Sequence, residues 1–161
     1  KISMSINTVQ NYLKYLSNAF FIDKVQRYDI QGKRIFEIND KYYFRDLGLK
    51  HSKIPYKPND INKIIENLVY NHLIYNGYKV FVGKIDDKEI DFFATKNNET
   101  IYIQAAYLLP DEKTIEREFE NLLQIKDNYK KIVVSADSYA IGNYKGIEHI
   151  NIHKFLTDYQ L

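Results

Sequence analysis

The sequence contains no cysteine among its 161 residues, which excludes disulfide bonds and thiolate-bound metal sites. No apolar run approaches the ~20 residues that a membrane-spanning helix needs, and no signal-peptide pattern opens the chain. The formal net charge is only +2, which by itself is too small to argue for a nucleic-acid partner. We therefore expect a cytoplasmic protein that does not associate with membranes.

A phosphate-binding P-loop is also missing. Such a loop needs the pattern G-x-x-x-x-G-K-[ST]. The nearest approach, from Gly77 to Ile85, has one residue too many between its glycines and lacks the hydroxyl. We therefore expect no ATP site in this chain.

The residues that are present suit a folded domain, because 45% are apolar and 15% aromatic. Residues 5–19 predict a helix capped by Ser5. Three extended stretches follow this helix: FFIDKVQRYD, KRIFEI and KYYFRDLGL. A helix followed by a hairpin predicts a winged-helix-like unit over residues 1–49. Residues 50–59 carry two prolines and predict a linker.

Residues 60–161 predict an α/β domain, a mixed sheet with flanking helices. Asp60 is expected to cap a helix that ends at Asn76-Gly77. Three strands follow, joined by the turn-prone pairs Asp86-Asp87 and Asn97-Asn98. After Pro110 the pattern predicts an amphipathic helix, a buried strand, a short strand and a terminal helix.

Three polar residues lie among the apolar stretches of this second part. Glu66 falls at the border of the apolar stripe of its helix. Asp91 lies in the strand KEIDFFAT, and Gln104 in the strand TIYIQAAY, on the side of Tyr102 and Ala106. Carboxylate and amide oxygens are the ligands that Mg²⁺ prefers, so a magnesium site at Asp91 and Glu66 is one interpretation. The alternative is ordinary: Asp91 bonded to backbone near a sheet edge, and Glu66 on a solvated helix margin.

Other polar residues suggest two further sites. Asn7, Thr8, Asn11 and Lys14 on the first helix could face a DNA groove, as a recognition helix does. Only Lys14 among them is cationic, however, and phosphate contacts dominate such affinity, so a docking or lid role is the alternative. His149 and His153 are four residues apart, but no third metal ligand is nearby. We expect both of these to be surface histidines.

The order of these motifs resembles a known family. IIENLVYNHLIYNGYKVFVG, EIDFFA and IYIQAAY resemble the PD-(D/E)XK nuclease-like, or restriction-endonuclease-like, fold. With TVQNYLKYLSNAFFIDKVQRYD, KYYFRDLGL and REFENLLQIKDNYKKIVVS, almost the whole chain is similar to the C-terminal region of a group of prokaryotic AAA+-like ATPases. In that group a P-loop domain precedes a winged helix and a nuclease-like domain of unassigned function. The resemblance implies an N-terminal ATPase domain as a partner, and the absence of an initiator methionine at Lys1 agrees with a C-terminal piece.

The resemblance also implies roles for the three polar residues. Glu66 matches the helix glutamate, Asp91 the metal-binding aspartate, and Gln104 the acidic position of the D/E-x-K pair. The lysine expected two residues later is Ala106, and that lysine helps to stabilise charge on the phosphate. The residues therefore imply a vestigial catalytic site in a module that docks DNA or a protein partner. The alternatives are a Mg²⁺-dependent DNA nuclease whose lysine has migrated, with Lys84 or Lys126 as candidates, and a structural or oligomerisation module.

Overall fold

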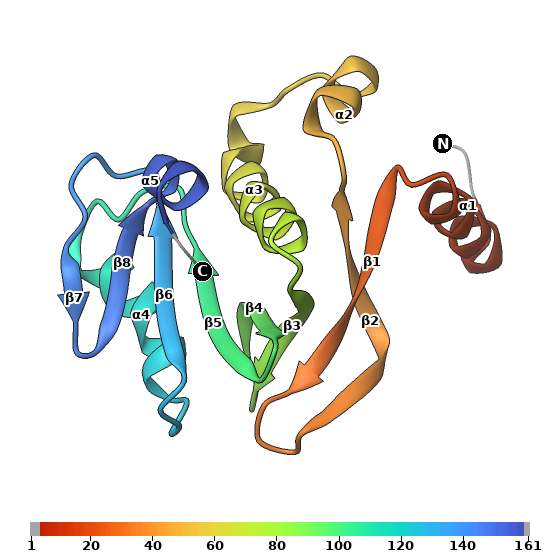
Figure 1. The fold of residues 1–161 in the computed structure, drawn as a ribbon. Helices are drawn as coiled ribbons and strands as arrows, with labels where there is room; N and C mark the ends of the chain where they lie inside the picture. The colour runs from red at the N-terminus through yellow and green to blue at the C-terminus, as the bar shows by residue number, and fades with distance from the viewer. Residues whose placement is uncertain (1–3, 160–161) are drawn as a thin grey trace.

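The apolar stretches of the sequence form one mixed β-sheet with helices on both faces (Figure 1). The computed structural model describes residues 4–159. In chain order the elements are α1 (Ile6–Asn18), β1 (Ile22–Asp29), β2 (Arg34–Phe44), α2 (Leu47–Lys53), the 3₁₀ turn η1 (Pro58–Asp60), α3 (Ile61–Tyr75), β3 (Lys79–Ile85), β4 (Lys88–Lys96), β5 (Glu99–Ala105), α4 (Glu112–Leu123), β6 (Lys130–Ser135), β7 (Gly142–Tyr144), β8 (Ile147–Asn151) and α5 (Ile152–Thr157).

The sheet has eight strands within the described residues, in the order β2-β1-β3-β4-β5-β6-β8-β7. The pairs β1–β3, β5–β6 and β6–β8 are parallel, and the other neighbours are antiparallel. The predicted α/β class is confirmed. Because β1 pairs with β3, the first hairpin extends the sheet of the second part of the chain.

Two hydrophobic cores lie on opposite faces of this sheet. One contains Val69 and Leu73 of α3 with Phe155 of α5, and the other contains Phe119 and Leu122 of α4. Successive residues of β6 point alternately into the two cores, and both cores are apolar, so this strand is apolar without alternation. Among the described helices, none is long and apolar enough to cross a membrane.

The N-terminal elements differ in part from the prediction. The first helix forms as α1, and the Ser5 hydroxyl accepts the predicted capping bond from the Thr8 N–H at 3.1 Å. The second and third extended stretches are one continuous strand, β2, so the expectation of three strands here was wrong. The residues after β2 form α2, which Asp46 caps. This helix was missed because its 7 residues are too few for an apolar period to show.

Most of the predicted turns and helix ends form where glycine or asparagine residues allow a left-handed backbone conformation. Gly77 has a φ of 79°, as the predicted left-handed helix ending requires. Asn97 and Asn98 have φ values of 48° and 67° and make the tight β4–β5 turn. Asp60 precedes α3, but its side chain makes no capping hydrogen bond. The short strand β7 was not predicted.

The end of β2 is fastened to α3 by side chains. The amide of Asn67 accepts a hydrogen bond from the Phe44 N–H at 2.8 Å and donates one to the Phe44 carbonyl at 2.7 Å. The Tyr43 ring stacks on the Tyr70 ring at 4.4 Å. A segment before the predicted linker therefore contacts a helix after it directly.

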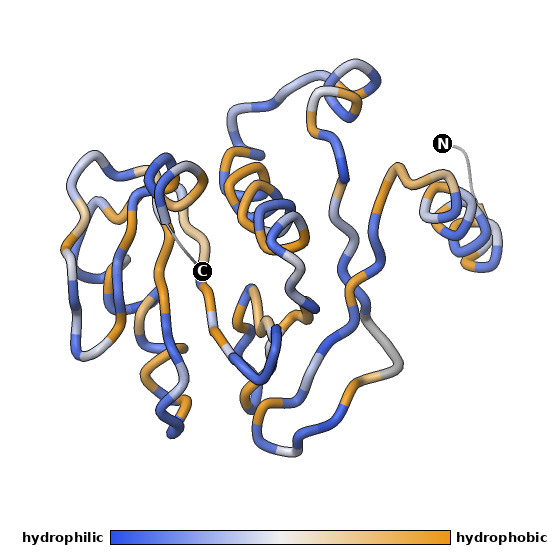
Figure 2. Tube along the Cα trace, viewed as in Figure 1, coloured by the Kyte–Doolittle hydropathy of each residue, from blue (hydrophilic) through white to orange (hydrophobic). Residues whose placement is uncertain are grey.

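Helix α1 stands apart from the two cores (Figure 1). None of its residues is buried, although Figure 2 shows apolar positions along it. Ile6, Tyr12 and Leu16 are 76%, 58% and 39% exposed. The helix thus presents an apolar face that the described residues leave uncovered.

Limited proteolysis tests the division of the chain at residues 50–59. Residues 52–59 are exposed, and exposed connections are where proteases cut first. We expect one early cut in this segment and two fragments that still elute together under native conditions, since β1–β3 pairing and the β2–α3 contacts hold them. Fragments that separate without denaturant would instead indicate two independent units, and cuts only near the termini would contradict an accessible linker.

Candidate functional site

Asp91 lies in a β-bulge of β4. Phe81 pairs with Phe93 and Gly83 with Ile90, so one residue of β3 faces two residues of β4, Asp91 among them. Bulges turn a side chain away from regular alternation and occur often beside functional sites. Asp91 is 8% exposed.

Asp91 and Gln104 complete the pairing of β4 and β5 where the regular ladder stops. The registered pairs run from Lys96 and Glu99 to Phe92 and Ile103. Beyond them, the Asp91 N–H donates to the Gln104 side-chain oxygen at 3.3 Å. The Asp91 carboxylate accepts from the Ala105 N–H at 2.9 Å. The prediction that these two strands are neighbours is confirmed, and the backbone contact foreseen in the ordinary interpretation of Asp91 is present.

Glu66 reaches the same cluster from α3 and is not a solvated helix margin. Its Oε1 accepts from the Tyr43 hydroxyl at 2.6 Å and from the Lys41 ammonium at 2.8 Å. Its side chain is 18% exposed. Burial and the charge of Glu66 raise the pKa of Tyr43 far above its ordinary value, so the hydroxyl stays a donor.

Lys41 of β2 is the centre of the cluster. Its Nζ lies 2.8 Å from Glu66 Oε1, 2.5 Å from Glu89 Oε1 and 3.9 Å from Asp91 Oδ1. Glu89 also pairs with the Arg27 guanidinium. We call Arg27, Lys41, Glu66, Glu89 and Asp91 the charged cluster.

The charges of the cluster are not balanced when every group is ionised, because two cations face three carboxylates. Burial is the main cause that raises the pKa of Asp91 to about 8, and the charge of Glu66 adds to it. The Lys41 ammonium and the Ala105 N–H oppose this rise. Burial lowers the pKa of Lys41, but the charges of Glu66 and Asp91 outweigh burial and leave that pKa above its ordinary value. Lys41 therefore stays a cation here, and the raised pKa of Asp91 favours its protonated form.

These side chains, as placed, do not fit a magnesium site. No three His, Asp or Glu side chains in the described part of the chain form a group that could hold a metal ion. The Lys41 nitrogen lies where a cation would meet the carboxylates of Glu66 and Asp91. Ala106, where the resemblance implies a lysine, is 6% exposed and packs in the core on the α4 side of the sheet.

Sequence reasoning missed the lysine that joins the cluster. Lys84 lies over the Phe36 ring at 5.7 Å, and Lys126 lines a pocket at the end of α4. Neither forms an ion pair with the cluster among the described residues. The only signal for Lys41 was its place two residues before Tyr43 on one strand, which puts both side chains on one face. That signal identifies no partner.

The candidate DNA-contacting residues remain a prediction. Asn7, Asn11 and Lys14 are exposed on α1, and the Thr8 hydroxyl is hydrogen-bonded to Ser5 at 2.9 Å. Asn7, Asn11 and Lys14 lie on the side of the helix away from Val9 and Leu16 by helical spacing. No contact links them to the charged cluster.

His149 is not a surface histidine, as was expected, since it is 3% exposed. Its Nδ1 accepts from the Ile141 N–H at 2.9 Å, so Nε2 carries the proton and donates to Ser135 at 2.8 Å. The Ser135 hydroxyl then donates to Asp137 at 2.7 Å. This direction is the reverse of what a nucleophilic serine needs, and Ser135 is fully buried. The network is structural, and His153 is exposed as expected.

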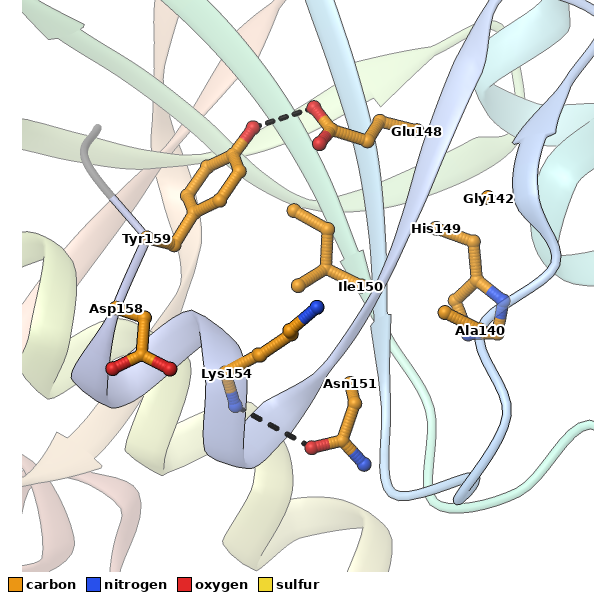
Figure 3. Close-up of a pocket in the computed structure, with 9 residues that line it drawn as sticks. All are labelled: Ala140, Gly142, Glu148, His149, Ile150, Asn151, Lys154, Asp158 and Tyr159. Atoms are coloured by element: carbon orange, nitrogen blue, oxygen red, sulfur yellow. Dashed lines mark hydrogen bonds between the residues drawn. The ribbon is translucent and has the colours of Figure 1, made fainter.

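A pocket of about 380 Å³ lies between α5 and β8 (Figure 3). The Tyr159 hydroxyl donates to Glu148 across it at 2.5 Å, and Lys130 pairs with the same carboxylate. The Asn151 side chain caps α5. Two polar side chains of this pocket, Tyr159 and Glu148, are thus bonded to each other, and the pocket shares no lining residue with the charged cluster.

The comparisons with known proteins give one partial family match and one longer relative. Residues 1–60 match the model described as Domain of unknown function (DUF8612). The chain is 40% identical over 156 residues to an uncharacterized protein of Haemophilus influenzae, a match that covers 97% of this chain and 38% of that relative. The chain therefore spans well under half the length of this relative. No solved structure matches it.

The protonation of Asp91 predicts a pH-dependent stability difference. A carboxyl group whose pKa is higher in the folded state favours folding when protonated, and this contribution is lost as pH rises from about 4 towards 8. Asp91→Asn stays neutral and keeps an acceptor for the Ala105 N–H. We expect the unfolding free energy of the variant, relative to wild type, to increase between pH 5 and pH 8 in urea titrations.

Asp127→Asn is the matched control of opposite sign. Burial raises the pKa of Asp127, but hydrogen bonds from Tyr102 and Lys131 outweigh it and bring that pKa below its ordinary value. Its contribution is complete above about pH 4 and is lost as pH falls below that value. The unfolding free energy of this variant should therefore differ from that of wild type by a constant amount between pH 5 and pH 8, and the difference should shrink only below about pH 4. If the unfolding free energy of Asp91→Asn relative to wild type is flat or falls as pH rises, the assignment of a proton to Asp91 is wrong.

Proposed function

We propose that this chain is a winged-helix-like unit with a catalytically degenerate nuclease-like module, part of an AAA+-like P-loop ATPase. It docks DNA or a protein partner for that motor and works in the cytoplasm. The order of Glu66, Asp91 and Gln104 supports this proposal, as does their convergence beside a bulged strand. The longer Haemophilus relative leaves room for a motor domain outside the matched segment.

One observation carries the catalytic part of the proposal: the Lys41 ammonium sits among the carboxylates of the charged cluster. A divalent ion bound by Glu66 and Asp91 would have to displace this ammonium. The position that supplies a lysine in an active site of this type is a buried alanine, Ala106. Phosphodiester hydrolysis needs a metal-activated water and positive charge at the phosphate, whereas the two cations of the cluster, Lys41 and Arg27, are paired with its carboxylates.

The uncovered face of α1 supports a docking role. Ile6, Val9, Tyr12 and Leu16 recur at helical spacing and are all exposed. Exposed apolar stripes of this kind mark contact surfaces between proteins. We assign this face to the ATPase portion of the longer protein, and the polar face with Asn11 and Lys14 to solvent or DNA.

The distance from Lys41 to Asp91 favours a second candidate function, a Mg²⁺-dependent DNA nuclease. Here Lys41 would be the migrated lysine, since its Nζ lies 3.9 Å from Asp91 Oδ1. In this candidate Lys41 leaves Glu66 when magnesium and a phosphate arrive. The two functions differ in one measurable outcome, the cleavage of DNA.

A plasmid-nicking assay decides between them. We expect the wild-type chain with Mg²⁺ or Mn²⁺ to leave supercoiled plasmid intact at the level of a chelator control. Losing one electrostatic donor lowers a rate by ~10²–10³, and here Ala106 and Gln104 are two defects. Nicking that disappears with chelator, with Asp91→Ala and with Lys41→Met would overturn the inactive assignment and establish the second candidate.

Lys41→Met tests the cluster as an internal ion-pair network. Breaking a buried pair leaves an uncompensated charge and lowers the free energy of unfolding by about 3–5 kcal/mol. Because Lys41 and Glu89 are partly exposed, we expect Lys41→Met to lower it by about 2 kcal/mol. We also expect Mg²⁺ to raise the melting temperature of Lys41→Met more than that of wild type, because three carboxylates lose their shared cation. Lys84→Met is the control, and equal losses in both variants would contradict a special role for Lys41.

A further inference from the structure

A pocket lined by aromatic rings lies on the α4 side of the sheet, beside the β4–β5 ladder and away from Asp91. Its volume is about 730 Å³, within the range of small-ligand sites. We call it the aromatic trough. Its lining comes from the end of β1, the β1–β2 turn, β4, β5 and the connection from α4 to β6: Tyr28, Ile30, Lys33, Phe93, Thr100, Tyr102, Asp127, Asn128 and Tyr129.

Four rings follow one another across the trough. Tyr28 stacks on Phe93 with centroids 4.4 Å apart and 17° between the planes. Phe93 lies 5.5 Å from Tyr102, and Tyr102 lies 6.4 Å from Tyr129. Phe93 and Tyr102 are nearly buried and form the floor, whereas Tyr129 is 52% exposed. The trough therefore offers an accessible aromatic surface supported from below by packed rings.

The charges around the trough are positive on balance. Asp127 is already bound, because it accepts from the Tyr102 hydroxyl at 2.7 Å and from Lys131 at 3.0 Å. A second pocket of about 400 Å³ adjoins the trough, sharing Lys33 and Asp127 and adding Lys126. Lys33 and Lys126 form no ion pair with any residue between 4 and 159. The ammonium groups of Lys33 and Lys126 therefore lie beside the aromatic rings without a carboxylate partner among the described residues.

We infer that the aromatic trough binds a nucleobase that carries a phosphate. Bases stack on tyrosine rings regardless of sequence, and lysines beside the rings follow the phosphates. Asn128 and Thr100 add an amide and a hydroxyl to the lining of the trough, and groups of both kinds hydrogen-bond to the polar edge of a base. A purely apolar ligand would leave both lysines and these polar groups unused. The inference uses neither the charged cluster nor α1, so it stands or falls separately from the proposed function.

The test measures binding of a fluorescent ten-nucleotide single-stranded DNA by anisotropy at low salt. An abasic strand of the same length carries the phosphates without the bases. We expect the abasic strand to bind at least tenfold more weakly. Tyr129→Ala should weaken binding of the normal strand about tenfold, as loss of one stacked base does. Lys33→Gln should weaken both strands alike.

Matched controls are Tyr139→Ala and Lys113→Gln, which change an exposed tyrosine and an exposed lysine outside the trough. Melting temperatures confirm that each variant folds. Competition by free AMP would indicate a site for a single nucleotide. If AMP does not compete, the site takes a nucleic-acid strand. In both cases the ligand is a base that carries a phosphate, as inferred. Equal binding of the abasic strand, no binding of the normal strand, or equal effects of Tyr129→Ala and Tyr139→Ala would overturn the inference.

Discussion

One ammonium group holds the candidate site together. Lys41 enters from β2 and neutralises carboxylates that come from α3 and β4. Without it, Glu66, Glu89 and Asp91 would repel one another in a region that water enters little, where such repulsion is strong. The same stretch of β2 carries Tyr43, which bonds to Glu66 and stacks on α3. Electrostatics and packing therefore fix the same strand against the same helix.

The bulge in β4 is the second constraint, because it decides which groups Asp91 meets. The extra residue interrupts the ladder, and two backbone N–H groups lose regular strand partners. Asp91 and Gln104 take over these donors with their side chains. A buried N–H without a partner would cost about 1–3 kcal/mol, so both residues stabilise the fold whether or not they ever bind a metal. Their presence in this chain needs no catalytic explanation.

Much of the fold was predictable because it rests on local chemistry. Periodicity predicted α1, α3 and α4, and the asparagine pair predicted the β4–β5 turn that brings Asp91 and Gln104 to adjacent strands. Contacts between distant segments were not predictable. Lys41 and Glu66 are 25 positions apart in the sequence, yet their side chains are hydrogen-bonded. His149 is buried and hydrogen-bonded to Ser135, a contact that no spacing rule predicts. β2 was divided wrongly because the middle of this long strand carries polar residues, and α2 is too short to show a period.

The charged cluster balances its carboxylates with groups of its own chain. A divalent ion supplies two positive charges to a group of carboxylates. Lys41 and the Arg27 guanidinium supply the same two charges through covalently attached side chains, and the raised pKa of Asp91 allows one proton to balance the third carboxylate. Such an arrangement satisfies the carboxylates but supplies no Lewis acid and no metal-activated water. The face of α1 and the aromatic trough lie outside this cluster, so substitutions on either surface leave its ion pairs in place.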